Sequence, residues 1–210
     1  PHVGSSIPSA RILRQKAAGR KHAAPRAGAG RGCTDGVGSD DMAAPSTPEF
    51  WLRGPVEGVH PALMPAAHAF LQTIADVEAA TAGLTNQQWW LSPGGAASIG
   101  FHVMHLGGST DRLLTYARGE MLSEAQKAAF RAESSPPHVD TAALLSELRR
   151  SFDAAMAQVR ATPASSLYDA RAVGRAALPT TVIGLLFHAA EHSQRHAGQI
   201  VTMAKVVRSL

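Results

Sequence analysis

Three histidines recur at every fourth position near the end of the sequence. They are His188, His192 and His196, and Glu191 and Arg195 lie between them. In an α-helix a step of four residues turns a side chain by only about 40° and moves it about 6 Å along the axis, so the three imidazoles share one face. Apolar residues at the same spacing place this face toward the protein interior. A buried imidazole needs a partner, and one bound metal ion would serve several of them at once.

A second segment carries two more histidines beside a pair of glycines. His102 and His105 are three residues apart, and Gly107 and Gly108 follow within the same predicted helix. Each glycine inside a helix costs about 1 kcal/mol relative to alanine. We therefore expect another backbone or a ligand to approach closely there, with the glycines forming a cavity wall. Histidines from two helices together predict a metal site with three imidazoles and an open fourth position, which is typical of catalytic rather than structural zinc.

Two other metal motifs fit the sequence less well. His188-x-x-Glu191-His192 matches the inverted zincin protease motif, with Glu191 as the general base. Such proteases take a carboxylate ligand further along the chain, and residues 193–210 contain no acidic side chain. A di-iron carboxylate bundle needs a Glu-x-x-His motif on two helices. The only such motif in residues 42–210 runs from Glu57 to His60, ahead of the first long helix, so we reject both interpretations.

The elements that must position these residues are predicted to be helices. Apolar residues at helical spacing predict helices over residues 61–82, 98–118, 123–132, 141–161 and 181–208. Ser98 and either Asp140 or Thr141 are favourable first caps, and Gly119 suits a helix end. No alternating strand pattern or hairpin signal is apparent. The sequence therefore predicts an all-α four-helix bundle with one short extra helix.

The excess of basic over acidic residues lies entirely in the N-terminal fifth of the chain. The 210 residues include 20 Lys and Arg against 16 Asp and Glu, yet residues 42–210 carry thirteen of each. Residues 1–41 are rich in Gly, Ala and Arg without hydrophobic periodicity, so we expect a disordered basic tail. We also consider this tail an upstream segment that need not belong to the mature protein. Residues 42–57 are expected to form a linker, and residues 58–210 the helical bundle.

This distribution of charge and apolar residues narrows the classes of partner. A neutral body disfavours nucleic acid, and the apolar runs are far shorter than a membrane helix requires. The single cysteine, Cys33, excludes a cysteine-based metal site and a disulfide framework. We expect a cytoplasmic protein whose partner is a small-molecule substrate, with a homodimer as an open alternative.

The two histidine segments together resemble the DinB/YfiT-like superfamily of bacterial metal-binding four-helix proteins. The resemblance rests on SIGFHVMHLGGSTDRLLTYARGE (98–120) and FHAAEHSQRHAGQI (187–200), and it covers roughly residues 55–208. In that family one histidine of the second helix and a pair four residues apart in the last helix hold a divalent metal. Carried over to this sequence, the resemblance implies that His105, His192 and His196 are the ligands. Imidazole suits several metals; we expect zinc first, with nickel, iron or manganese as alternatives.

Other polar residues of the two segments have no assigned place in that pattern. His102, His188 and Glu191 are candidates for a fourth ligand, a hydrogen-bond partner of a ligand or a proton carrier. Arg112, Arg195 and Tyr116 are candidates for binding the substrate; a solvent-exposed position or an ion pair with Asp111 or Glu191 is the alternative for the two arginines. The sequence assigns no further catalytic residue.

The resemblance also implies a type of reaction. Characterised members of the superfamily include S-transferases and isomerases that use bacillithiol or mycothiol, so we expect a metal-dependent transferase with a low-molecular-weight thiol. A metal with one open position can hold such a thiol as the nucleophilic thiolate. The same position could instead activate water in a metal-dependent hydrolase. A non-catalytic module that binds a metal and a small molecule is the remaining alternative.

Overall fold

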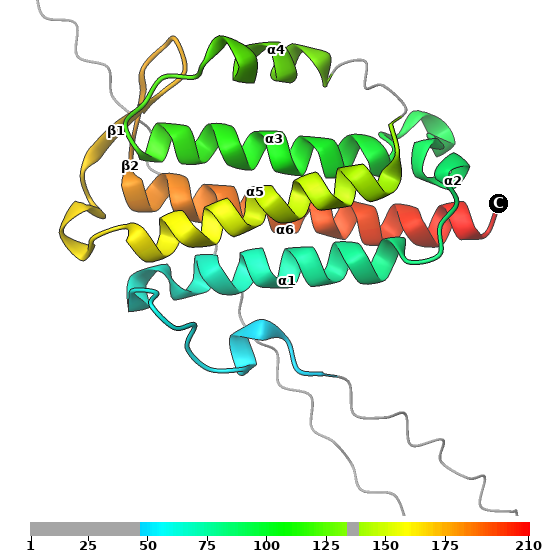
Figure 1. The fold of residues 1–210 in the computed structure, drawn as a ribbon, viewed down its shortest axis with the longest axis horizontal. Coiled ribbons are helices and arrows are strands. Elements are labelled where there is room, and N and C mark those ends of the chain that lie inside the picture. Colours follow the sequence, from blue (N-terminus) through cyan, green and yellow to red (C-terminus); the bar gives the residue numbers. More distant parts are fainter. Residues whose placement is uncertain (1–46, 134–138) are drawn as a thin grey trace, which may run out of the picture. The chain divides into compact units, whose positions relative to one another are not determined.

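Four long helices pack side by side in the computed structural model, which describes residues 47–133 and 139–210 (Figure 1). They are α1 (Met64–Thr81), α3 (Ile99–Ala117), α5 (Thr141–Ala161) and α6 (Val182–Arg208). A shorter helix, α4 (Glu124–Ala132), lies outside the bundle alongside α3. The predicted all-α bundle with a short extra helix is confirmed. The predicted disorder of residues 1–41 lies outside the described residues.

The helices begin where short polar side chains cap their first turns. Ser98 Oγ accepts a hydrogen bond from the Phe101 amide of α3 at 3.2 Å, and Asp140 Oδ2 accepts one from the Ala143 amide of α5 at 3.0 Å. Such caps satisfy backbone donors that the helix itself leaves unpaired. Gly119 follows α3 with a φ of +81°, a conformation that glycine adopts at little cost. These local signals explain why the predicted helix bounds lie close to the observed ones.

The inward faces of the long helices form one hydrophobic core. Its largest fully buried side chains are Trp89, Phe70, Leu63, Ile99, Leu106, Leu148, Leu186, Ile200, Val77, Val103, Val159 and Val207. A buried polar contact also fixes the rotation of α6, because Gln194 Nε2 donates to Thr73 Oγ1 of α1 at 2.7 Å and to Ala69 O at 2.9 Å. Residues two positions from Gln194 point to the opposite side of the helix. This contact therefore turns His192 and His196 away from α1.

The structure also contains a short hairpin, for which no pattern was apparent in the sequence. Strands β1 (Ala170–Val173) and β2 (Leu178–Thr181) pair antiparallel, with Ala172 opposite Pro179. Each strand has only four residues, which is too short for an alternating pattern to stand out. Proline disfavours strands generally but is tolerated where one edge is free of a neighbour, as in a two-stranded sheet.

A short helix that the sequence analysis did not predict, α2 (Asn86–Trp90), closes one end of the bundle (Figure 1). Thr85 and Gln88 form a reciprocal capping box at its start. Trp89 is buried in the core, and the ring of Trp90 lies against Gly100 of α3. A Cβ on Gly100 would lie 2.6 Å from that ring, so only glycine leaves room for it.

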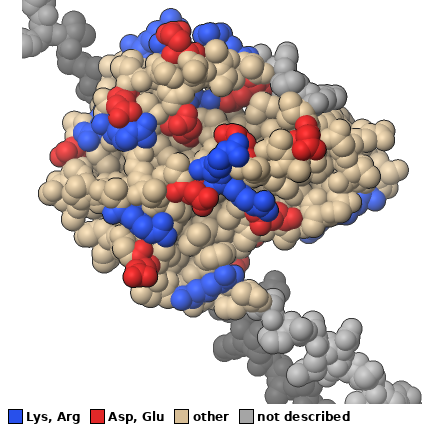
Figure 2. Space-filling view, in the orientation of Figure 1, with Lys and Arg blue, Asp and Glu red and all other residues tan. Residues whose placement is uncertain are grey.

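The surface of the bundle mixes charges of both signs. On the face shown in Figure 2, Lys and Arg lie beside Asp and Glu instead of gathering into a basic patch. Within the described ranges, none of the helices combines the length and the hydrophobicity that crossing a membrane requires.

Candidate metal centre

Three histidines meet between α3 and α6. His105 comes from α3, and His192 and His196 come from successive turns of α6. One ring nitrogen of each lies within 4.8 Å of those of the other two. The Nε2 atoms of His105 and His192 are 3.1 Å apart, and the ring centre of His196 lies 4.7 Å from that of His105 and 4.6 Å from that of His192. The structure thus brings together the three residues that the family resemblance assigned as ligands.

The chemistry and spacing of these donors fit a divalent metal. Two imidazole nitrogens bound tetrahedrally to zinc at about 2.05 Å would lie about 3.3 Å apart, close to the 3.1 Å between His105 and His192. Burial, followed by the neighbouring His105, His192 and His102, lowers the pKa of His196 to about 4. Burial and His105 also lower the pKa of His192. Because a metal binds the neutral ring, these lowered pKa values keep the donor nitrogens available.

His102 lies behind His196 rather than inside the cluster. Its Nδ1 is 2.9 Å from Nδ1 of His196, and only 7% of the residue is exposed. This contact occupies one ring nitrogen of His196 and leaves Nε2 free for a metal. Burial and the nearby His105 lower the pKa of His102, so the ring stays neutral and can accept a hydrogen bond from His196.

His188 and Glu191 continue along α6 away from the cluster. The His188 side chain is 52% exposed, and its ring centre lies 5.7 Å from that of His192. Its Nδ1 is 4.0 Å from Oε2 of Glu191. The Glu191 carboxylate also accepts from Arg195 Nη2, at 2.6 Å to Oε2. These residues form an exposed polar row beside the metal centre, and neither His188 nor Glu191 joins the group of three.

The sequence analysis missed the carboxylate that holds His105. Glu133, the C-cap residue immediately after α4, is 6% exposed, and its Oε2 lies 2.8 Å from Nδ1 of His105. Because an ionised carboxylate can only accept, Nδ1–H of His105 donates, and the lone pair of Nε2 faces His192. No motif links two residues 28 positions apart. The available signal was an acidic residue at a helix C-terminus, where the helix dipole disfavours negative charge.

Arg112 also binds the Glu133 carboxylate that contacts His105. Its Nη1 donates to Glu133 Oε1 at 2.6 Å, its Nη2 donates to Glu133 Oε2 at 3.3 Å, and its guanidinium lies 4.5 Å from the ring centre of Phe130. The partner of Arg112 is therefore Glu133, so neither of the alternatives considered for it, a solvent-exposed position or an ion pair with Asp111 or Glu191, is found. The Arg112 side chain is only 11% exposed, and its guanidinium forms an ion pair with Glu133.

Of the two remaining candidates for substrate binding, Arg195 lies beside the cluster on α6 and Tyr116 lies apart from it. Arg195 is 60% exposed and pairs with Glu191, which was the alternative expected for it. Tyr116 follows His105 by eleven residues on α3, which places it about 16 Å further along the axis. It is buried in the hydrophobic core. Tyr116 therefore cannot contact a ligand bound at the histidines.

The paired glycines of α3 make room for side chains from two neighbouring helices. A Cβ on Gly108 would lie 2.6 Å from Glu133 Oε1 and 2.9 Å from Arg112 Nη1. A Cβ on Gly107 would lie 3.3 Å from Ser151 Oγ of α5. Side chains, and not the backbone of another helix, therefore make the close approach at these glycines.

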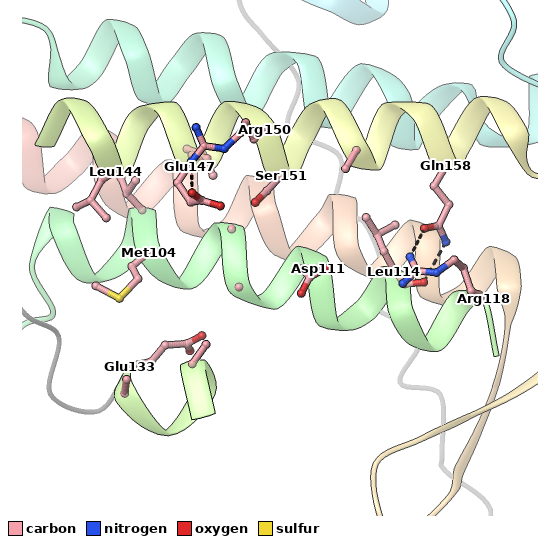
Figure 3. Close-up of a pocket in the computed structure, with 17 residues that line it drawn as sticks. Met104, Asp111, Leu114, Arg118, Glu133, Leu144, Glu147, Arg150, Ser151 and Gln158 are labelled. Atoms are coloured by element: carbon pink, nitrogen blue, oxygen red, sulfur yellow. Dashed lines mark hydrogen bonds and ion pairs between the residues drawn. The ribbon is translucent and has the colours of Figure 1, made fainter. Parts of the chain in front are cut away.

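Both glycines line a cleft between α3, α4 and α5 with a volume of about 740 Å³ (Figure 3). Its walls are largely apolar, with Met104 from α3 and Leu144 from α5 at one end and Gln158 near the other. Glu133 faces this cleft and at the same time bonds to His105. One carboxylate thus connects the cleft with the metal centre.

A second, more open hollow of about 670 Å³ lies beside α3 and α6. It is lined by His102 from α3 and by Arg195, Gln199 and Met203 from α6. His102 contacts His196, so the hollow lies next to the cluster, although none of the three clustered histidines lines it.

A known protein family matches most of the helical bundle. The sequence profile of the DinB superfamily matches residues 69–200, a span that contains all three clustered histidines. Among curated proteins, none matches the chain. Because the matched span covers more than half of the sequence and ends within α6, the chain belongs to the DinB superfamily.

Proposed function

We propose that this DinB-superfamily protein is a metal-dependent transferase that uses a low-molecular-weight thiol. The observation that carries the proposal is the convergence of three imidazole nitrogens within 4.8 Å. Among the described residues no fourth protein side chain joins this group. Three neutral ligands and an open position are typical of a catalytic centre.

Each side chain of the centre has a distinct part in this proposal. His105, His192 and His196 would hold the metal, with zinc expected first and nickel, iron or manganese as alternatives. Glu133 would orient His105, and His102 would orient His196. When bound, the metal would supply a position on which a thiol ionises to its nucleophilic form.

The surroundings of the centre favour a small molecule as the substrate. The cleft beside Glu133 and the hollow beside His102 each have the volume of a small-ligand site. The mixed charges in Figure 2 offer no continuous basic surface for nucleic acid on that face. We therefore propose an electrophilic small molecule as the second substrate.

The experiment that tests the proposal begins with metal-stripped full-length protein. Zinc chloride is added back, metal content is measured by elemental analysis, and loss of free thiol is followed with a small thiol and an electrophile. His192→Ala tests the cluster, and His188→Ala is the matched control because this exposed histidine lies one turn away on the same helix. We expect zinc-dependent thiol consumption in the wild type and in His188→Ala, and none in His192→Ala.

The other outcomes each contradict part of the proposal. Stoichiometric zinc without thiol consumption would indicate the non-catalytic binding module. Zinc-dependent cleavage of an activated ester without any thiol would indicate the hydrolase. Protein that takes up no zinc would overturn the metal centre itself.

A further inference from the structure

Helix α4 is attached to the bundle mainly through polar contacts. None of its residues, 124–132, is buried. Gln126 Nε2 donates to Asp111 Oδ2 at 2.7 Å and to Thr115 Oγ1 at 2.8 Å, and both acceptors belong to α3. An apolar face therefore contributes little to holding this helix, and its position depends on a few specific groups.

The buried group among these contacts is the carboxylate at the end of α4. Glu133 is 6% exposed, and its two oxygens lie between the guanidinium of Arg112 and the imidazole of His105. A buried carboxylate is unfavourable unless it is paired and hydrogen-bonded. The contacts with Arg112 and His105 supply both requirements, so α4 is anchored where it reaches the metal centre.

The glycine at position 108 is an independent sign that this contact is built into the helix. A side chain there would meet Glu133 Oε1 at 2.6 Å, and no other residue type leaves that space. Glycine weakens the middle of a helix. Its presence beneath the carboxylate is explained if the contact between Glu133 and His105 matters to the protein.

We propose that Glu133 is a positioning residue, held by Arg112, that fixes Nε2 of His105 as the metal-binding atom and couples metal affinity to the docking of α4. This inference rests on the proposed metal centre. A carboxylate that accepts from Nδ1–H sets the tautomer, aims the ring and makes the opposite nitrogen a stronger donor. Coupling is reciprocal, so a contact that strengthens metal binding is itself strengthened by the metal.

The role of Glu133 in positioning His105 is tested by the zinc affinity of full-length variants, measured by competition with a chromophoric chelator. Glu133→Gln keeps the size of the side chain and removes its charge. We expect its zinc affinity to fall by about 10- to 100-fold, the effect known for partners of metal-bound histidines. Glu124→Gln is the matched control, because it removes the same charge from the exposed start of α4, where Glu124 pairs with Lys127 at the opposite end of the helix from Glu133. Its affinity should equal that of the wild type.

The coupling between metal binding and the docking of α4 is tested by amide hydrogen exchange of the wild type, which needs no substitution. Zinc should slow amide exchange across residues 124–133, and the effect should be absent in Glu133→Gln. The absorption spectrum of the cobalt-loaded protein adds a readout of ligand geometry, and it should change in Glu133→Gln but not in Glu124→Gln.

The possible results separate the inference from the function on which it rests. Equal zinc affinity of Glu133→Gln and wild type, or zinc loading that leaves exchange in α4 unchanged, would overturn the inference and leave the metal centre intact. A wild type that fails to bind zinc would overturn both. If Glu133→Gln does not fold, the exchange measurement on the wild type still decides whether α4 senses the metal.

Discussion

The adjacent glycines of α3 allow two opposite outcomes to be predicted for the same substitution. Alanine in place of glycine inside a helix stabilises it by about 1 kcal/mol when nothing obstructs the methyl group. At position 107 the new Cβ would lie 3.3 Å from Ser151 Oγ. Rotation of the serine side chain to another staggered position would remove this close contact. We expect Gly107→Ala to raise the free energy of unfolding by up to about 1 kcal/mol and to leave zinc affinity unchanged.

The same methyl group at position 108 meets two charged side-chain ends that are held in an ion pair. It would lie 2.6 Å from Glu133 Oε1 and 2.9 Å from Arg112 Nη1, so the ion pair must shift by several tenths of an ångström. Glu133 Oε2 bonds to His105 at 2.8 Å, and a shift of that size lengthens the bond beyond useful geometry. Losing a hydrogen bond to a charged group costs about 1.5–3 kcal/mol. This loss exceeds the gain in helix propensity.

Gly108→Ala should therefore be less stable than Gly107→Ala by about 1.5–3 kcal/mol and should bind zinc about tenfold more weakly than the wild type. Urea unfolding of the metal-free proteins measures the first quantity, and chelator competition measures the second. Two variants with equal stability and equal zinc affinity would refute the assignment of Gly108 as the space that Glu133 occupies.

Three further predictions concern the histidines and the end of the bundle. His196→Ala should abolish stoichiometric zinc binding in equilibrium dialysis, whereas retained binding would remove His196 from the ligand set. The metal-free protein should lose thermal stability as the pH falls from about 6.5 toward 4, because the unfolded chain protonates His196 near 6.5 and the folded protein only near 4. Protons then favour the unfolded state within this window, this contribution is absent above it, and the fall in melting temperature should be shallower in His196→Gln. Gly100→Ala should destabilise the protein by about 1–3 kcal/mol because its methyl group overlaps the Trp90 ring, and an unchanged urea midpoint would contradict that contact.

The helices were predictable because their signals are local. Ser98 and Asp140 cap their helices through bonds to residues three positions away, and such bonds depend only on the neighbouring sequence. The hairpin over 170–181 was not predictable, because its four-residue strands are stabilised by pairing with each other and not by a pattern within either one.

The candidate site likewise has one part that local sequence predicts and another that only helix packing decides. The 3.6-residue period of a helix is enough to place His192 and His196 on one face, and the sequence determines this without knowledge of the fold. His192 and His196 lie near His105 only because α6 packs against α3. The residue spacing alone left the set of ligands open, and the family resemblance identified His105 as the third one. Local periodicity carries no information about distances between helices.

The partners of His105 and Arg112 were decided by the tertiary structure alone. Glu133 reaches both residues because α4 folds back along α3 and places its last carboxylate above Gly108. No spacing rule connects residues 105, 112 and 133, since the turn between α3 and α4 sets their distances. By itself the sequence determined a helical bundle with a row of histidines on its last helix, because helix periodicity is a property of adjacent residues. The contacts of Glu133 with His105 and with Arg112 arise only from packing, which brings residues distant in sequence within hydrogen-bond reach.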